Sequence, residues 1–271
     1  MNKIKNNAGI TLIELLISSI MSVIVIGAAM GVYIAQHKHM VIQDQVTDMQ
    51  HNVRASMEEL TSKIRMAGYN VPDGINPLVA YNTNPDTIVI IYDSDLAQDI
   101  DIDHNMPQLS AELRCDDDDL SALHDGDWVY IYDPATQQGE FFLISHVQYG
   151  SGHIQHNTMP LTRYYPVGSR IIRMNRYKYY VDYTSDPNHP KLMVQNIGDT
   201  PQIYADDITD LQFKYRLSSG ALVDVPAMAQ MVREVMIDVT ARTQRADEAG
   251  NYGYRTRNLQ TGVKVRNLGI N

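Results

Sequence analysis

The chain has 271 residues, of which 44% are hydrophobic and 20% are charged, a composition typical of folded protein rather than of disorder. Its formal net charge of −10 argues against a nucleic-acid backbone as the main partner, because phosphates require clustered Lys and Arg. The single cysteine, Cys115, excludes an intramolecular disulfide, a Cys-x-x-Cys redox pair, a cysteine-rich zinc knuckle and a c-type haem attachment site.

An apolar run extends from Ile10 to Gln36 and contains one charged residue, Glu14. The run is about twice as long as the roughly 7–15 apolar residues of a cleaved secretory signal, and no Ala-x-Ala site follows it. A helix of about 20 apolar residues crosses a bilayer, so a plain signal anchor fits this length. Such an anchor explains neither Gly9 before the run nor Glu14, since a carboxylate in a membrane helix costs roughly 2.5–3.5 kcal/mol.

The run begins with the stretch Gly9-Ile10-Thr11-Leu12-Ile13-Glu14-Leu15-Leu16. This stretch resembles the cleavage and methylation motif of type IV prepilins and type II secretion pseudopilins. The resemblance implies that residues 1–9 are a leader, which the prepilin peptidase removes after Gly9, and that the mature chain starts at an N-methylated Ile10. Most members of the family have Phe at this position, so Ile10 is a departure that bears on methylation rather than on cleavage.

The same resemblance gives Glu14, with Thr11, a role in subunit assembly. Cleavage leaves a positively charged α-amine on Ile10, and in the family's filaments the equivalent glutamate pairs with the amine of a neighbouring subunit. A charge without a partner is strongly penalised in a low-dielectric helix bundle, so this pair would set the axial register. The alternative is that Glu14 reaches the lipid–water interface near the helix end.

Beyond Gln36 the helical pattern continues without a proline, which predicts one helix with a transmembrane half over 10–36 and an amphipathic half over 37–68. Gly68 is the expected C-terminal cap. By the positive-inside rule, Lys3 and Lys5 keep the N-terminus in the cytoplasm. The apolar face of the second half has residues three or four positions apart: Ile42, Val46, Met49, Val53, Met57, Leu60 and Ile64.

Two glycines in the transmembrane half, Gly27 and Gly31, have the Gly-x-x-x-Gly spacing that lets membrane helices approach closely. Small residues are also common in such segments without any packing role, and both interpretations stay open here. Major pilins usually carry a proline near this place in the helix. Its absence favours a minor subunit over a bulk one.

Both ends of the chain carry looser similarities. The stretch Leu60-Thr61-Ser62-Lys63-Ile64-Arg65-Met66-Ala67-Gly68-Tyr69 is similar to the end of this helix in PilW-like minor pilins. The C-terminal segment from Val232 to Leu268 resembles that family and the type II secretion J pseudopilins. Residues 70–230 match no known pattern.

Residues 69–271 read as a β-rich globular domain, because β-branched and aromatic runs alternate with Asp, Pro and Gly turns. Strands that follow one another without long helices predict antiparallel sheet, and the apolar helix face would cover one side of it. The expected fold class is therefore α+β, with one short helix near residues 226–231. The predicted strands are Thr87–Tyr92, Trp128–Tyr132, Glu140–Ile144, Tyr177–Tyr183, Ile208–Leu217 and Val235–Val239.

Acidic residues cluster at Asp99, Asp101 and Asp103, with Asp93 and Asp95 just before them and a run over 116–119. Calcium prefers such oxygen-rich clusters. An EF-hand starting at Asp99 would need Gly instead of His104 and an acidic ligand instead of Ser110. A solvated acidic loop and a calcium site are both compatible with the pattern, and no other cofactor is indicated.

The sequence contains no recognisable catalytic arrangement, so an enzyme is not expected. Ser145 and His146 are neighbours in a predicted strand and would face opposite sides of it. Gly150-Ser151-Gly152-His153 does not match a Gly-x-Ser-x-Gly elbow. His153 and His156 could meet on a turn, but no carboxylate or third ligand is anchored nearby in the sequence, and surface or packing roles are expected for the histidines.

One basic stretch interrupts the acidic background, with Arg170, Arg173, Arg176 and Lys178 interleaved with Tyr177, Tyr179 and Tyr180. Interleaved basic and aromatic residues can bind single-stranded nucleic acid. A strand held by salt bridges, or a surface that docks an acidic neighbour, is the preferred interpretation.

These features together predict a minor pilin that primes a type IV pilus or forms its tip. It would reside in the inner membrane as a single-pass protein with a cytoplasmic N-terminus, and later in the fibre at the cell surface. Its expected partners are the prepilin peptidase, other minor and major pilins, the inner-membrane assembly platform and membrane lipid. The alternatives are a J-like type II secretion pseudopilin and a membrane-anchored periplasmic binding module that does not polymerise.

Overall fold

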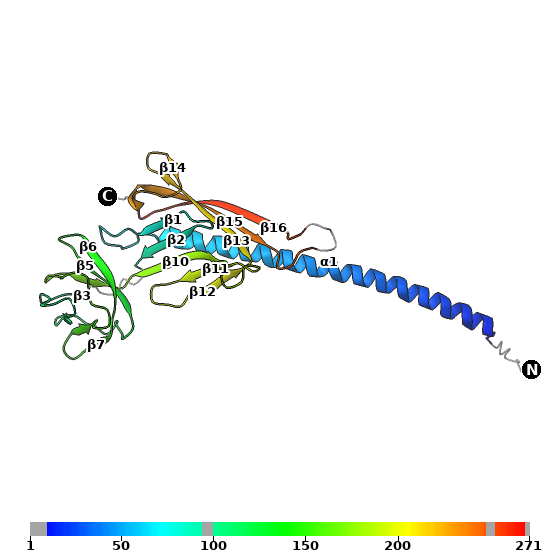
Figure 1. Cartoon of the computed structure of the whole chain (residues 1–271), viewed down its shortest axis with the longest axis horizontal. Coiled ribbons are helices and arrows are strands. Elements are labelled where there is room, and N and C mark those ends of the chain that lie inside the picture. Colours follow the sequence, from blue (N-terminus) through cyan, green and yellow to red (C-terminus); the bar gives the residue numbers. More distant parts are fainter. Residues whose placement is uncertain (1–9, 94–99, 248–252, 269–271) are drawn as a thin grey trace, which may run out of the picture.

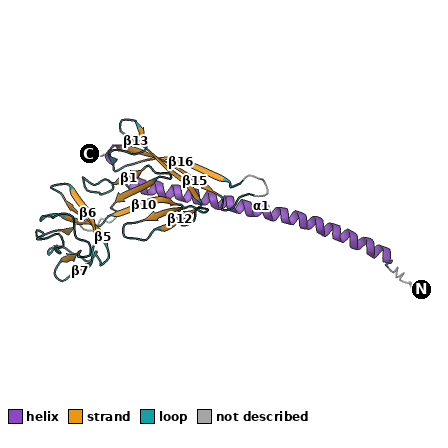
Figure 2. Ribbon diagram, in the orientation of Figure 1, coloured by secondary structure: helices purple, strands orange, loops and turns teal. Residues whose placement is uncertain are grey.

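The computed structural model describes residues 10–93, 100–247 and 253–268, and shows one long helix joined to a β-rich head (Figure 1). The helix, α1 (Leu12–Met66), has 55 residues and therefore measures about 80 Å at 1.5 Å per residue. Its first half projects from the head and its second half runs along it (Figure 2). The predicted continuous helix and the α+β fold class are confirmed.

The second half of α1 packs against two antiparallel sheets. It contacts β2 and β12 of one sheet and β15 and β16 of the other. The predicted apolar face is the buried one from Met49 onward, whereas Ile42 and Val46 are half-buried. The buried helix residues are Met49, Val53, Ser56, Met57, Leu60 and Ile64. Ser56 is tolerated among them because its hydroxyl donates to the Asn52 carbonyl at 2.7 Å.

The first sheet has the strand order β1-β2-β10-β11-β12. Its strands are β1 (Leu78–Tyr81), β2 (Thr87–Tyr92), β10 (Asn175–Asp182), β11 (Lys191–Gln195) and β12 (Gln202–Asp206). The second sheet has the order β14-β13-β15-β16. Its strands are β13 (Ile208–Leu217), β14 (Leu222–Val223), β15 (Val232–Arg242) and β16 (Thr256–Lys264). The short helix expected near residue 226 is a single 3-10 turn, η1 (Ala229–Met231).

A lobe with its own core is inserted between β2 and β10. These two strands are neighbours in the first sheet, with Ile90 opposite Tyr177. The chain therefore leaves the sheet at the end of β2 and returns beside that strand as β10. The lobe, residues 100–172, lies at the end of the head farthest from the N-terminus of α1 (Figure 1). Its strands are β3 (Ile100–Asp101), β4 (Leu113–Arg114), β5 (Trp128–Asp133), β6 (Gln138–Leu143), β7 (His146–Gln148), β8 (His153–Gln155) and β9 (Arg170–Ile172).

The lobe joins the first sheet through a small apolar cluster. Val89 and Ile91 of β2 point away from α1 and pack with Tyr130 and Tyr132 of β5 and with Met174. The next residues of β2, Ile88 and Ile90, belong to the core beneath the helix. A strand buried on both faces needs apolar residues at every position, which explains why the sequence of β2 is an unbroken apolar run.

Gly68 ends the helix in a conformation that other residues avoid. Its φ is +78°, and its N–H donates to the Ile91 carbonyl at 3.0 Å. A Cβ at this position would lie 2.7 Å from Leu268 Cδ2. The cap residue is therefore Ala67, whose N–H donates to the Ile64 carbonyl, and the expected cap Gly68 is the next residue, which joins the helix end to β2.

Gly68→Ala is expected to lower the free energy of unfolding by about 1–3 kcal/mol, because a side chain is strained at this φ and meets Leu268. For a head of this size each kcal/mol corresponds to roughly 2–4 °C in Tm. Thermal unfolding of the full chain in detergent measures the shift. Gly150→Ala is the control, since nothing lies within 4 Å of a Cβ there. An unchanged Tm for Gly68→Ala would contradict the role of this glycine.

Candidate functional site: the bare half of the long helix

The first half of α1 contacts no other part of the described chain. Every residue from 10 to 41 is exposed, including Leu12 at 84% and Ile13 at 67%. Large apolar side chains in such a contiguous set mark a surface that another apolar phase covers. The helix has the length and composition of a membrane span, which is consistent with a single-pass membrane anchor.

Glu14 and Thr11 close the beginning of this helix as a capping box. The Thr11 hydroxyl accepts the Glu14 N–H at 3.3 Å, while Glu14 Oε2 accepts the Thr11 N–H and hydroxyl at 2.9 Å each. Such pairs satisfy N–H groups that a helix start leaves open. Thr-x-x-Glu is the sequence signature of this motif, and sequence reasoning overlooked it. In the single chain, Glu14 therefore already has a structural partner, and its predicted pairing with another subunit stays a prediction.

Polar side chains inside the bare half satisfy their hydrogen bonds locally. Ser18, Ser19 and Ser22 donate to backbone carbonyls three or four residues earlier, at 2.7–2.9 Å. These bonds lower the penalty of hydroxyl groups in an apolar environment. Gly27 and Gly31 have nothing within 4 Å of a Cβ position, so their surface is open to another helix. This is compatible with a helix-packing role of the two glycines and with the absence of one.

The end of the apolar run carries interfacial residues. The Tyr33 and His37 rings stack with centroids 6.2 Å apart, and Lys38 follows directly. Amphipathic rings and cations collect at membrane–water interfaces. The 24 residues from Glu14 to Lys38 span about 36 Å, a little more than the roughly 30 Å of a hydrocarbon layer. Both charged residues therefore come near an interface when the helix crosses a bilayer.

The acidic cluster of the lobe is held by backbone groups. Asp118 accepts the Asp101 N–H at 2.6 Å, and Asp103 accepts the Asp117 N–H at 3.2 Å. In the part of the chain that the structure describes, no group of three or more His, Cys, Asp or Glu side chains is arranged to hold a metal. Asp95 and Asp99, like Gly9, lie outside the described residues, so the calcium site stays a prediction.

The basic stretch is divided between the two faces of β10 and its approach. Arg170 lies 3.9 Å from Asp101, and Arg173 lies 3.8 Å from Asp127, as the salt-bridged interpretation predicts. Lys178 lies over the Tyr180 ring at 4.6 Å. Tyr177 and Tyr179 lie on the other face of the strand, toward α1. There the buried Tyr179 donates to Glu59 at 2.6 Å. The interleaving is therefore the two-residue period of a strand and makes no continuous stacking surface.

The histidines in the lobe have different environments. His153 lies between the carboxylates of Glu112, at 3.2 Å, and Asp116, at 3.3 Å. The expectation that no carboxylate lies near it is wrong, because β4 pairs with β8 and brings distant residues together. His156 is buried, and its Nε2–H donates to the Ala111 carbonyl at 2.7 Å, which is a packing role. Ser145 bonds Asn157 and His146 bonds Asp125, so the two are not paired.

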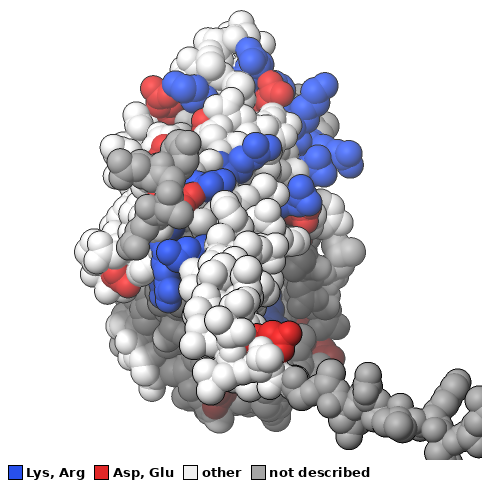
Figure 3. Space-filling view, turned by 90° about the vertical axis from the view of Figure 1, so that its right-hand side faces the viewer, with Lys and Arg blue, Asp and Glu red and all other residues white. Residues whose placement is uncertain are grey.

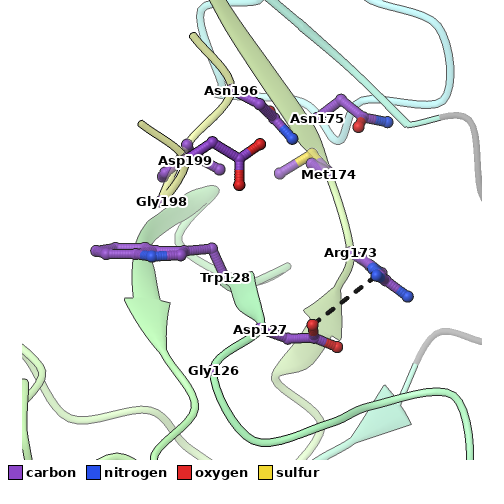
Figure 4. Close-up of a pocket in the computed structure, with 10 residues that line it drawn as sticks. Gly126, Asp127, Trp128, Arg173, Met174, Asn175, Asn196, Gly198 and Asp199 are labelled. Carbon is purple, nitrogen blue, oxygen red and sulfur yellow. Dashed lines mark ion pairs between the residues drawn. The ribbon is translucent and has the colours of Figure 1, made fainter. Parts of the chain in front are cut away.

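A polar cleft of about 570 Å³ lies where the lobe meets the first sheet (Figure 4). Asp127 and Trp128 line it from the lobe, and Asp199 lines it from the β11–β12 turn. The Trp128 ring lies against Gly198, where a Cβ would be only 2.1 Å from the indole Cδ1. The charged side chains among the described residues that line the cleft are Asp127, Arg173 and Asp199. Trp128 acts here as a contact between the two parts of the head.

No protein-family model and no curated protein matches the sequence of this chain. The architecture itself is pilin-like, since a long N-terminal apolar helix is laid on an antiparallel β-sheet domain. The narrower PilW-like assignment rests on the sequence similarities of residues 60–69 and 232–268 and stays a prediction.

Cys115 provides a direct probe of the lobe. Burial raises the pKa of its thiol to about 12, and the carboxylates of Asp118 and Asp103 add to the shift. The thiolate is the reactive form, so we expect no reaction with a thiol reagent at pH 8 in the folded protein and full reaction in denaturant. Gln244→Cys, at an exposed position, is the positive control. Rapid labelling of folded Cys115 would contradict the closed core of the lobe.

Proposed function

We propose that the chain is a PilW-like minor pilin, which enters type IV pili to prime their assembly or to form their tip. The observation that carries the proposal is the bare half of α1, which begins at the Thr11–Glu14 pair and continues without a break into the helix that supports the head. This helix serves two environments in turn. It spans the membrane before assembly and packs with the helices of neighbouring subunits afterwards.

The apolar surface suits both environments because membrane lipid and a helix bundle are equally apolar. Apolar side chains alone would allow neighbouring helices to slide along one another. A single charged pair in the bundle removes this freedom, since only one register satisfies both charges. The Ile10 α-amine created by cleavage is the partner proposed for Glu14 of the adjacent subunit, and the capping box holds Glu14 until then.

Gly9→Val is expected to leave the leader attached, retain the protein in the inner membrane and abolish complementation of a strain that lacks the gene. A blot for the leader and a count of surface pili measure the two effects. Ile10→Phe is the matched control, because it restores the residue most common in the family and should be cut normally. Normal pili in the strain without the gene would direct the search to a secretion pseudopilus, and normal function of uncut protein would refute the filament role.

Substitutions of Glu14 separate capping from intersubunit pairing. Glutamine can complete a capping box, as glutamate does, but it carries no charge. If the ion pair with the neighbouring amine is required, Glu14→Gln and Glu14→Ala should both be cleaved and both enter filaments at least about tenfold less, since an unpaired charge in the bundle costs several kcal/mol. Quantitative blots of sheared pili measure incorporation. Normal incorporation of Glu14→Gln alone would show that capping is the whole role of Glu14.

A further inference from the structure

The charges of the head are separated along its length. The lobe, residues 100–172, contains eleven Asp and Glu and three Lys and Arg, so it carries a charge of −8 out of the −10 of the whole chain. Seen from the end toward which the N-terminus of α1 projects, the head shows Lys and Arg side chains over its upper part, with Asp and Glu side chains among them (Figure 3). The remainder of the chain carries the other −2 and is nearly neutral overall.

Four arginines, which we name the arginine cluster, flank the turn between β15 and β16: Arg242, Arg245, Arg255 and Arg257. Two of them have intramolecular partners. Arg255 pairs with the buried Asp247 at 2.6 Å, and the Arg242 guanidinium lies over the Tyr254 ring at 4.1 Å. Arg245 and Arg257 are exposed and make no ion pair with any residue that the structure describes. Their charges are therefore available to an external partner.

The position of the cluster along α1 is set by one contact. The Arg245 N–H donates to Gln45 Oε1 at 3.0 Å, so this turn lies beside the helix seven residues after Lys38. Seven residues correspond to about 10 Å of helix. The headgroup layer beyond the hydrocarbon core is roughly 5–8 Å thick on each side, and charges act over about 8 Å at physiological salt. A long arginine side chain at this height reaches the headgroups when the apolar run fills the bilayer.

We propose that the arginine cluster binds the anionic phospholipid headgroups of the membrane in which α1 is anchored. Asp44 and Asp48 lie at about the same height on the helix, Asp247 pairs with Arg255, and Asp207 lies beside Arg242, whose backbone N–H donates to the Asp207 carbonyl at 3.0 Å. The attraction therefore depends on Arg245 and Arg257, which make no ion pair with any described residue. An anionic surface attracts these two arginines and repels the lobe. The head is then oriented with the arginine cluster toward the membrane and the lobe away from it. The inference rests on the membrane anchoring contained in the proposed function.

The test measures how close the turn comes to lipid. The full chain carries a fluorophore on Gln244→Cys, since the buried Cys115 does not compete for the label, and is inserted into phosphatidylcholine vesicles with or without phosphatidylglycerol. Nitroxide groups on lipid headgroups quench the fluorophore. We expect at least about twofold more quenching with phosphatidylglycerol, and a return to the lower value in Arg245→Glu/Arg257→Glu and at high salt.

A matched control makes the same charge change at the other end of β16. Lys264→Glu/Arg266→Glu should keep the additional quenching, because both residues are exposed at the end of the strand remote from the turn. Equal quenching in both lipids, equal loss in both double variants, or quenching that depends on protein density rather than on lipid charge would overturn the proposal. Vesicle flotation separates the two levels of the argument. A chain that does not float refutes the anchor, whereas a chain that floats but whose quenching does not depend on lipid charge refutes only the arginine cluster.

Discussion

One contact determines the arrangement of the whole molecule: the packing of α1 between Met49 and Ile64 against two sheets at once. The side chains of Leu60 and Ile64 are fully buried there, together with residues of β2, β13 and β15. A helix of this length is stable only where its apolar side is covered, and the head covers only its second half. The first half must find its cover in lipid or in other helices.

The same contact fixes the position of the head along α1. Because α1 is continuous, the distance from Glu14 to any point of the head is fixed by counting residues along the helix. Direct bonds add further restraints, such as Tyr179 to Glu59 and Arg245 to Gln45. The turn between β15 and β16 therefore lies beside the middle of α1, near the bare half, and the lobe lies at the far end of the head.

Local patterns were sufficient for much of this architecture. The helix and the strands β2 and β13 were predicted with bounds that agree with the structure to within two residues, because their apolar residues follow a clear period or an unbroken run. β16 was missed, since most of its side chains are exposed and Val263 is its one buried residue. The separate core of the lobe was also beyond prediction, because it depends on pairing Ile100 with Ile171 across some seventy residues of chain.

The functional residues show the same division. Glu14 could be found from its neighbours alone, although its bonds to Thr11 add a capping role that the motif had not suggested. The predicted environment of His153 was wrong because Glu112 and Asp116 flank β4, which pairs with the strand that contains His153. The arginine cluster was not recognised, since its members belong to segments more than ten residues apart in sequence that come together only when β15 pairs with β16, where Arg257 lies opposite Ala241.

The place of insertion separates the lobe from the packing of α1. Its position between two adjacent strands leaves the packing of α1 undisturbed, so the lobe can vary without affecting the anchor or the register at Glu14. Its charge of −8 keeps it away from an anionic membrane and from acidic copies of itself. A subunit at the tip of a fibre has its far end exposed, and here that end carries a separate core. If the chain is the minor pilin proposed above, the lobe is the part of the head best placed to meet partners outside the cell.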